Sequence, residues 1–251
     1  LDGDAEWKTQ MRAGQFDRSQ WGTTASFGTT NGAPTTFANL GRDTILNLSG
    51  LSPRKDQHKG LYLQSDFNTK VELAGMKHSL QMGVDFSREM ADFYVADGQP
   101  GTNYNKGPTS VGEPNTVGAT PISPKYRYDQ DYSSHSFGAY VQDLVEFAPG
   151  WKVLGGLRWD SVSSDLGRDV YTSGVYTRHE NSSLSYNSLW SQRLGLLYQP
   201  NEFASYHVAY STSFNSSADT YKYTSQQTAN TDPEKSRNFE IGATLDCLDS
   251  K

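Results

Sequence analysis

The sequence predicts an all-β fold in which about eight antiparallel strands form a portion of a transmembrane β-barrel. In residues 137–160, apolar residues alternate with polar or small ones on both sides of a tight turn. Aromatic residues bound this apolar stretch of about ten residues, which suits a tilted strand crossing ~25 Å of hydrocarbon. Short turns also alternate with long loops along the chain, as they do in outer-membrane barrels.

The clearest hairpin folds about Ala148, Pro149 and Gly150, which places the apolar residues of both strands on one face. The expected pairs are Phe147 with Trp151, Val145 with Val153, Val141 with Leu157, and Ala139 with Trp159. Asp143 falls on this apolar face beside Gly155, where a charge costs free energy unless it lies near the membrane interface. The sequence assigns Asp143 no role.

The other strands follow the same two-residue period. They are expected at Ala5–Gln20, Arg42–Leu73, His78–Val95, Leu184–Gln199, Phe203–Asn215 and Glu234–Leu248. Leu46 and Leu48 have the opposite parity to Leu61 and Leu63, so the second strand needs a bulge or break near residues 50–53. A turn at Pro200 and Asn201 would place Leu194 opposite Val208.

Long loops are expected at residues 21–41, 96–130, 167–183 and 216–233, whereas the other connections are short. Residues 96–130 hold five of the ten prolines. Loops of this length are uncommon unless they have a function. We therefore expect binding residues in these loops.

Composition excludes several classes of protein. The net charge of -6 over 251 residues offers no basic field for nucleic acid. No apolar run is long enough for a transmembrane helix. The single cysteine, Cys247, allows no internal disulfide and no multi-thiolate metal site, and it is interpreted as an apolar strand residue. The five histidines lack metal-ligand spacing and no catalytic motif occurs, so neither a metal site nor an enzyme is expected.

Six segments together resemble a known family. They are KHSLQMGVDFSRE (77–89), GAYVQDLVEF (138–147), WKVLGGLRWD (151–160), SQRLGLLYQP (191–200), ASYHVAYSTSF (204–214) and DPEKSRNFEIGATLD (232–246). In this order they are similar to barrel segments of the TonB-dependent outer-membrane receptors, and specifically of the ferric-siderophore receptors. Residues 1–76 match mainly in strand pattern.

The resemblance implies a barrel of 22 strands around an N-terminal plug domain. Residues 1–251 would then be a partial barrel domain, with the plug and the later strands outside this sequence. The implied location is the outer membrane of a Gram-negative bacterium. The implied partners are a ferric siderophore, outer-membrane lipid and, through the plug, the TonB–ExbB–ExbD system. No resident cofactor is implied, because iron arrives within its chelator.

Resemblance in residues 77–89 favours a catecholate ligand over a hydroxamate. Two alternatives remain open at this point. The receptor family also includes members for other ligands, such as cobalamin, haem or oligosaccharide. A soluble β-sandwich or propeller binding module, such as a lectin, would instead bury its apolar strand faces against a second sheet.

The expected ligand-binding residues are aromatic and cationic residues of the long loops. Tyrosine rings can pack on chelator scaffolds, and guanidinium groups can meet the negative charge of ferric chelates. Loop packing and interfacial aromatic belts are the alternative explanation. The candidates are Tyr104, Tyr126, Arg127, Tyr128, Arg168, Tyr171, Tyr176, Arg178, His179, Tyr221 and Tyr223.

Overall fold

The computed structural model describes residues 5–20, 24–49, 53–97, 108–114, 125–216 and 232–246. All of the regular elements in these ranges are β-strands. No helix long and apolar enough to cross a membrane occurs among them. The predicted all-β class is therefore confirmed.

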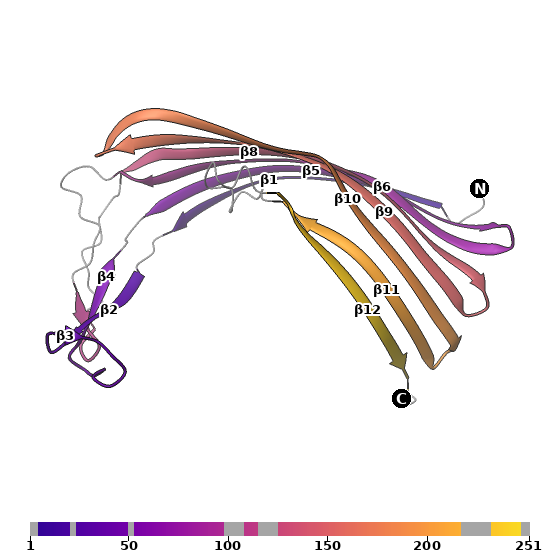
Figure 1. Cartoon of the computed structure of the whole chain (residues 1–251). Helices are drawn as coiled ribbons and strands as arrows, with labels where there is room; N and C mark the ends of the chain where they lie inside the picture. Colours follow the sequence, from indigo (N-terminus) through magenta and orange to yellow (C-terminus); the bar gives the residue numbers. More distant parts are fainter. Residues whose placement is uncertain are drawn as a thin grey trace.

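Eight strands form one antiparallel sheet in which each strand pairs with its neighbour in the chain order β1-β5-β6-β8-β9-β10-β11-β12. The sheet curves into an open wall with a concave and a convex face (Figure 1). Its strands are β1 (Ala5–Gln20), β5 (Arg54–Leu73), β6 (Met76–Ala96), β8 (Tyr126–Ala148), β9 (Trp151–Thr172), β10 (Val175–Asn201), β11 (Ala204–Asn215) and β12 (Glu234–Leu245).

The register of the β8–β9 hairpin follows the alternation of its sequence. Val141 lies opposite Leu157 and Val145 opposite Val153, as predicted. Asp143 also lies opposite Gly155, as predicted. Next to the turn the ladder shifts by one residue, so that Trp151 pairs with Ala148 and the predicted pairing of Phe147 with Trp151 is wrong.

Aromatic rings collect at two levels on the convex face. Near the short turns, the centroid of the Trp151 ring lies 6.4 Å from that of Phe147 and 4.2 Å from that of Tyr198, and Tyr198 lies 6.5 Å from Tyr206. Ten residues along β8, Phe137 lies 5.9 Å from Trp159. The convex-face residues between these levels are mostly apolar, so β8 and β9 carry an apolar band with aromatic ends.

Residues 167–183 do not form the expected loop. Strands β9 and β10 continue through this segment and meet at a two-residue turn, Ser173–Gly174. Both turn residues have positive φ, 51° and 79°, which is the geometry of a type I′ hairpin turn and matches the twist of the two strands. The turn therefore converts the predicted loop into a long hairpin.

The predicted strand 42–73 is divided, and its first part belongs to a second sheet. That sheet contains β2 (Thr24–Thr30), β3 (Ala33–Pro34), β4 (Thr44–Ser49) and β7 (Thr109–Ser110), in the order β3-β2-β4-β7. The predicted break before β5 is confirmed, but residues 21–41 and 96–130 contain strands as well as loops. The buried Thr30 and Thr44 hydroxyls, 2.8 Å apart, join β2 to β4.

Two further boundaries differ from the sequence prediction. Strand β10 continues to Asn201, and the Phe203 backbone N–H donates to the Asn201 side chain over 3.0 Å. Leu194 consequently lies opposite Tyr210 instead of Val208. Strand β12 ends at Leu245, and Cys247 lies outside the described residues.

A small apolar core lies on the concave face, beyond the level of Trp159. Ala91, Tyr132, Leu166 and Leu184 from four strands pack together and are each less than 9% exposed. The Tyr132 and Ser164 hydroxyl oxygens lie 3.3 Å apart beside them. The core joins β6, β8, β9 and β10 where the strands extend past the apolar band.

We expect Leu166→Ala to lower the free energy of unfolding by about 2–5 kcal/mol, because the truncation leaves a cavity among packed side chains. Leu166 is 4% exposed, whereas Leu40 is 47% exposed, so Leu40→Ala serves as the control and should change the free energy by less than about 1 kcal/mol. Denaturant unfolding of both variants measures the difference. Equal effects would show that the concave core does not stabilise the sheet.

Candidate functional site

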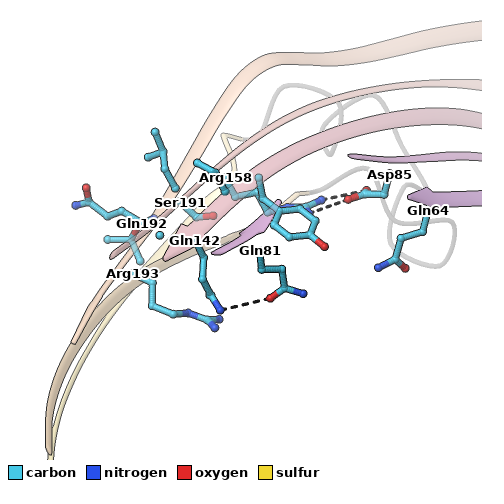
Figure 2. A pocket seen from close by; sticks show the side chains of 13 residues that line it. Gln64, Gln81, Asp85, Gln142, Arg158, Ser191, Gln192 and Arg193 are labelled. Atoms are coloured by element: carbon cyan, nitrogen blue, oxygen red, sulfur yellow. Dashed lines mark hydrogen bonds and ion pairs between the residues drawn. The ribbon is translucent and has the colours of Figure 1, made fainter. Parts of the chain in front are cut away.

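A network of charged side chains lies on the concave face, centred on Arg158 of β9. The Arg158 Nη1 and Nη2 groups donate to the two Asp85 carboxylate oxygens over 2.8 and 3.1 Å. Arg158 also donates to Asp160, from Nε over 2.9 Å and from Nη2 over 2.6 Å. Figure 2 shows the guanidinium and Asp85 pointing toward one another. The Arg158 guanidinium thus joins a carboxylate of β6 to one of β9, the strands on either side of β8.

Polar residues continue from this network across the sheet. The Tyr140 hydroxyl donates to Asp66, whose carboxylate also accepts from the Gln64 side chain over 3.0 Å. The Gln142 and Gln81 amides lie 3.5 Å apart (Figure 2). A shallow hollow of about 500 Å³ lies here, and its lining includes Gln64, Gln81, Tyr140, Gln142 and Arg193.

Strand register explains why these side chains meet. One row across the sheet reads Asp66, Gly83, Tyr140, Arg158, and the next reads Gln64, Asp85, Gly138, Asp160. A glycine in each row leaves room for its larger neighbours. A Cβ atom at Gly138 would lie 2.2 Å from Arg158 Nη2, and one at Gly83 would lie 2.7 Å from an Asp66 oxygen.

The long hairpin brings several of the predicted ligand-binding residues together. The Arg127 guanidinium carbon lies 3.7 Å from the centre of the Tyr171 ring, and the Tyr171 and Tyr176 rings meet edge to face at 5.8 Å. The buried Arg127 Nη1 has no hydrogen-bond partner among the residues that the structure describes. Tyr126 lies on the same strand, with the Lys55 Nζ 4.5 Å from its ring centre.

A second group of predicted residues lies on the convex face of the same extension. The His179 Nδ1 lies 2.8 Å from Asp169, and its Nε2 lies 3.0 Å from the Asn181 side-chain oxygen. Tyr128 donates a hydrogen bond to Asp131. Burial, more than this bond, raises the pKa of the Tyr128 phenol. Hydrogen bonds to Asp169, Asn181 and Asp131 therefore fix the positions of the His179 and Tyr128 side chains without a ligand.

The remaining predicted residues take no part in either group. Arg178 donates to Glu180 over 2.9 Å, and the exposed Arg168 lies opposite Glu180 in the ladder. Tyr104, Tyr221 and Tyr223 lie outside the described residues.

Asp143 has a partner that the alternation of the sequence did not identify. Its Oδ2 lies 2.6 Å from Nδ1 of His78, on the adjacent strand β6 and on the same convex face. The signal was present, because His78 and Asp143 are the polar exceptions on two neighbouring apolar faces. The pair allows a carboxylate to lie on this face with a hydrogen-bond partner.

We expect Gly138→Ala to displace the Arg158 guanidinium and to lower the free energy of unfolding by about 1–3 kcal/mol. Gly155→Ala is the matched control on the next strand, since a Cβ there meets nothing within 4 Å. It should be neutral or stabilising by up to about 1 kcal/mol, because alanine restricts the unfolded chain more than glycine does. Thermal unfolding of both variants gives the comparison, and equal destabilisation would contradict the role of Gly138.

The hydrogen bond to Asp169 raises the pKa of His179 above its ordinary value. Its stabilising effect is therefore complete below pH ~6.5 and is lost as the pH rises through the raised pKa. NMR titration of labelled histidine should give the His179 ring a pKa above the ordinary histidine value, with His179→Gln identifying its signal. Asp169→Asn should return the pKa toward its ordinary value. An unchanged pKa in Asp169→Asn would contradict this assignment of cause.

The sequence and the fold are similar to those of known receptors. Residues 1–249 match the family model described as "TonB dependent receptor-like, beta-barrel". The metal-pseudopaline receptor CntO of Pseudomonas aeruginosa is 26% identical over 216 residues, which are 83% of this chain and 29% of CntO. This chain thus spans less than a third of that relative's length.

Two solved structures show the same fold. The siderophore receptor PiuA from Acinetobacter baumannii superposes with a TM-score of 0.69 at 20% identity, over 82% of this chain and 31% of PiuA. The ferric-catecholate import receptor Fiu from Escherichia coli superposes with a TM-score of 0.80 at 15% identity, over 99% of this chain and 37% of Fiu. The apolar convex face, the polar concave face and the family match agree: the chain belongs to the TonB-dependent receptors, as part of their β-barrel.

Proposed function

We propose that residues 1–251 form part of the barrel domain of an outer-membrane receptor that takes up a ferric siderophore in a Gram-negative bacterium. The observation that carries the proposal is the division of one sheet into an apolar convex face, a charged concave face and an extension that holds Arg127 against Tyr171. CntO is named as a receptor for a metal complex and PiuA as a siderophore receptor. The role is capture and passage of the chelate, without covalent catalysis.

The convex face is proposed to contact outer-membrane lipid. Phe137 and Phe147 mark the two aromatic levels on β8. Their separation of ten residues corresponds to ~33 Å along the strand, or ~23 Å across a membrane at a tilt of about 45°. This matches the apolar band of ~25 Å in outer-membrane barrels. The short turns then lie on the periplasmic side, and the β9–β10 hairpin lies outside the cell.

The concave face is proposed to face the plug domain that the family places inside its barrel. Arg158 already pairs with Asp85 and with Asp160, so a plug would meet a preformed polar surface. Glutamines 64, 81 and 142 offer further donors and acceptors. Coupling to the TonB–ExbB–ExbD system would pass through that plug.

Arg127, Tyr171 and Tyr176 are proposed to contact the chelate at the outer end of the wall. Arg127 is stacked on the Tyr171 ring, and its buried Nη1 lacks a hydrogen-bond partner among the described residues, so an anionic ligand that reached it would satisfy this group. A catecholate chelate is preferred, with support from the description of Fiu as a ferric-catecholate import receptor. A different metal complex is the second candidate, with support from the description of CntO.

We expect the purified full-length gene product to bind a ferric catecholate more tightly than a ferric hydroxamate or cobalamin in a competition assay. Arg127→Ala should weaken binding about tenfold, because it removes a charge and a cation–π contact. Arg127→Lys should recover part of the loss. Arg237→Ala, a change at an exposed residue of β12, is the control and should leave affinity unchanged. Tight binding of cobalamin alone would contradict the siderophore proposal.

A further inference from the structure

An apolar groove crosses the convex face in the middle of the sheet. It has a volume of about 660 Å³ and runs between aromatic walls that include Phe67, Trp159 and Trp190. Met82, Val84 and the small Ala139 line it between these walls. A linear apolar chain fits such a groove better than a polar ligand does, because few polar atoms reach its surface.

Cationic and polar side chains lie on the convex face next to this groove, a few residues farther along the strands from the short turns. On β6 the convex-face sequence passes from Val84 through Phe86 to Arg88, and Arg88 lies opposite His135 of β8. Both Arg88 and His135 are exposed. Lys59 of β5 is also exposed on this face, opposite Met90. The convex face thus presents a cationic patch, which we define as Lys59 and Arg88 together with the polar His135 beside them.

One carboxylate on this face, Asp17 of β1, lies near Lys59 and accepts a hydrogen bond from Gln57 over 2.9 Å. Others lie farther out. Asp92 and Asp131 face each other four residues beyond Arg88 and His135. Asp165 lies opposite Ser133, one pair beyond His135. Arg88 itself lies opposite Leu61 and His135, so no carboxylate is its direct partner across either ladder. Its guanidinium is placed to accept an outside anion.

We propose that this face holds an anionic, phosphate-bearing lipid, with its head group on the cationic patch and one acyl chain in the groove. Four residues separate Val84 from Arg88, which is ~13 Å along the strand. One leaflet of hydrocarbon is ~15 Å thick, so a single acyl chain spans from the patch into the groove. Arginine binds phosphate oxygens through paired N–H groups, and basic clusters beside the membrane attract anionic lipids.

The inference rests on the proposed placement of the convex face in the membrane. It is tested by native mass spectrometry of the full-length gene product with two probes of equal chain length, dimyristoyl phosphatidylglycerol and dimyristoyl phosphatidylcholine. We expect retention of the anionic lipid to exceed that of the zwitterionic lipid. Lys59→Gln and Arg88→Gln should each lower retention of the anionic lipid about fivefold. Lys70→Gln is the control, since Lys70 is exposed on the concave face of the same strand as Lys59.

Ala139→Phe tests the groove independently of charge, because the ring would fill the space between the aromatic walls. It should lower retention of both lipids while the thermal unfolding temperature stays within a few degrees. Equal retention of the two lipids by the unmodified protein would overturn the proposal, as would unchanged retention in Arg88→Gln. Binding of the ferric chelate is measured in the same variants. If the protein binds the ferric chelate but does not prefer the anionic lipid, this inference is refuted and the receptor proposal stands.

Discussion

The two-residue period of the antiparallel ladder is the constraint on which the rest of this structure depends. Because successive side chains point to opposite faces, one register sends Val141 and Leu157 to the convex face and Tyr140 and Arg158 to the concave face. A slip by one residue would exchange the two sets. In the proposed orientation, such a slip would bury charge in lipid and turn apolar residues toward the lumen, so both faces would oppose it and fix the register jointly.

The same register makes the charged network possible. Asp85, Gly138 and Asp160 lie in one row, and Gly83, Tyr140 and Arg158 lie in the row beside it. Neighbouring side chains on one face of a sheet compete for space, and a row of large residues would push Arg158 away from its carboxylates. Glycine at 83 and 138 removes that competition. The loss of β-propensity at these glycines is offset by charge-assisted hydrogen bonds.

The sequence predicted the parts of the sheet whose two faces differ in polarity. Residues 137–160 were assigned correctly except next to the turn, because apolar and polar residues alternate there with few exceptions, of which Asp143 is one. Residues 167–183 were assigned as a loop because Arg168, Asp169, Glu180 and Asn181 are polar on both faces, so the period carries no signal. Beyond the apolar band, the hairpin depends on its turn, where Ser173 and Gly174 both adopt positive φ. The proximity of Arg127 to Tyr171 depends on that hairpin and could not be read from spacing.

The extension of the strands also changes how the outer residues can function. A tyrosine in a long loop must be ordered when a ligand binds, and this ordering lowers affinity. Tyr171 and Tyr176 instead lie on paired strands across a two-residue turn, with their rings already in contact. Arg127 is held over Tyr171 by the adjacent strand β8. A rigid arrangement of this kind favours ligands that match its shape, so under the proposed function discrimination between chelates would arise from the hairpin as well as from the loops.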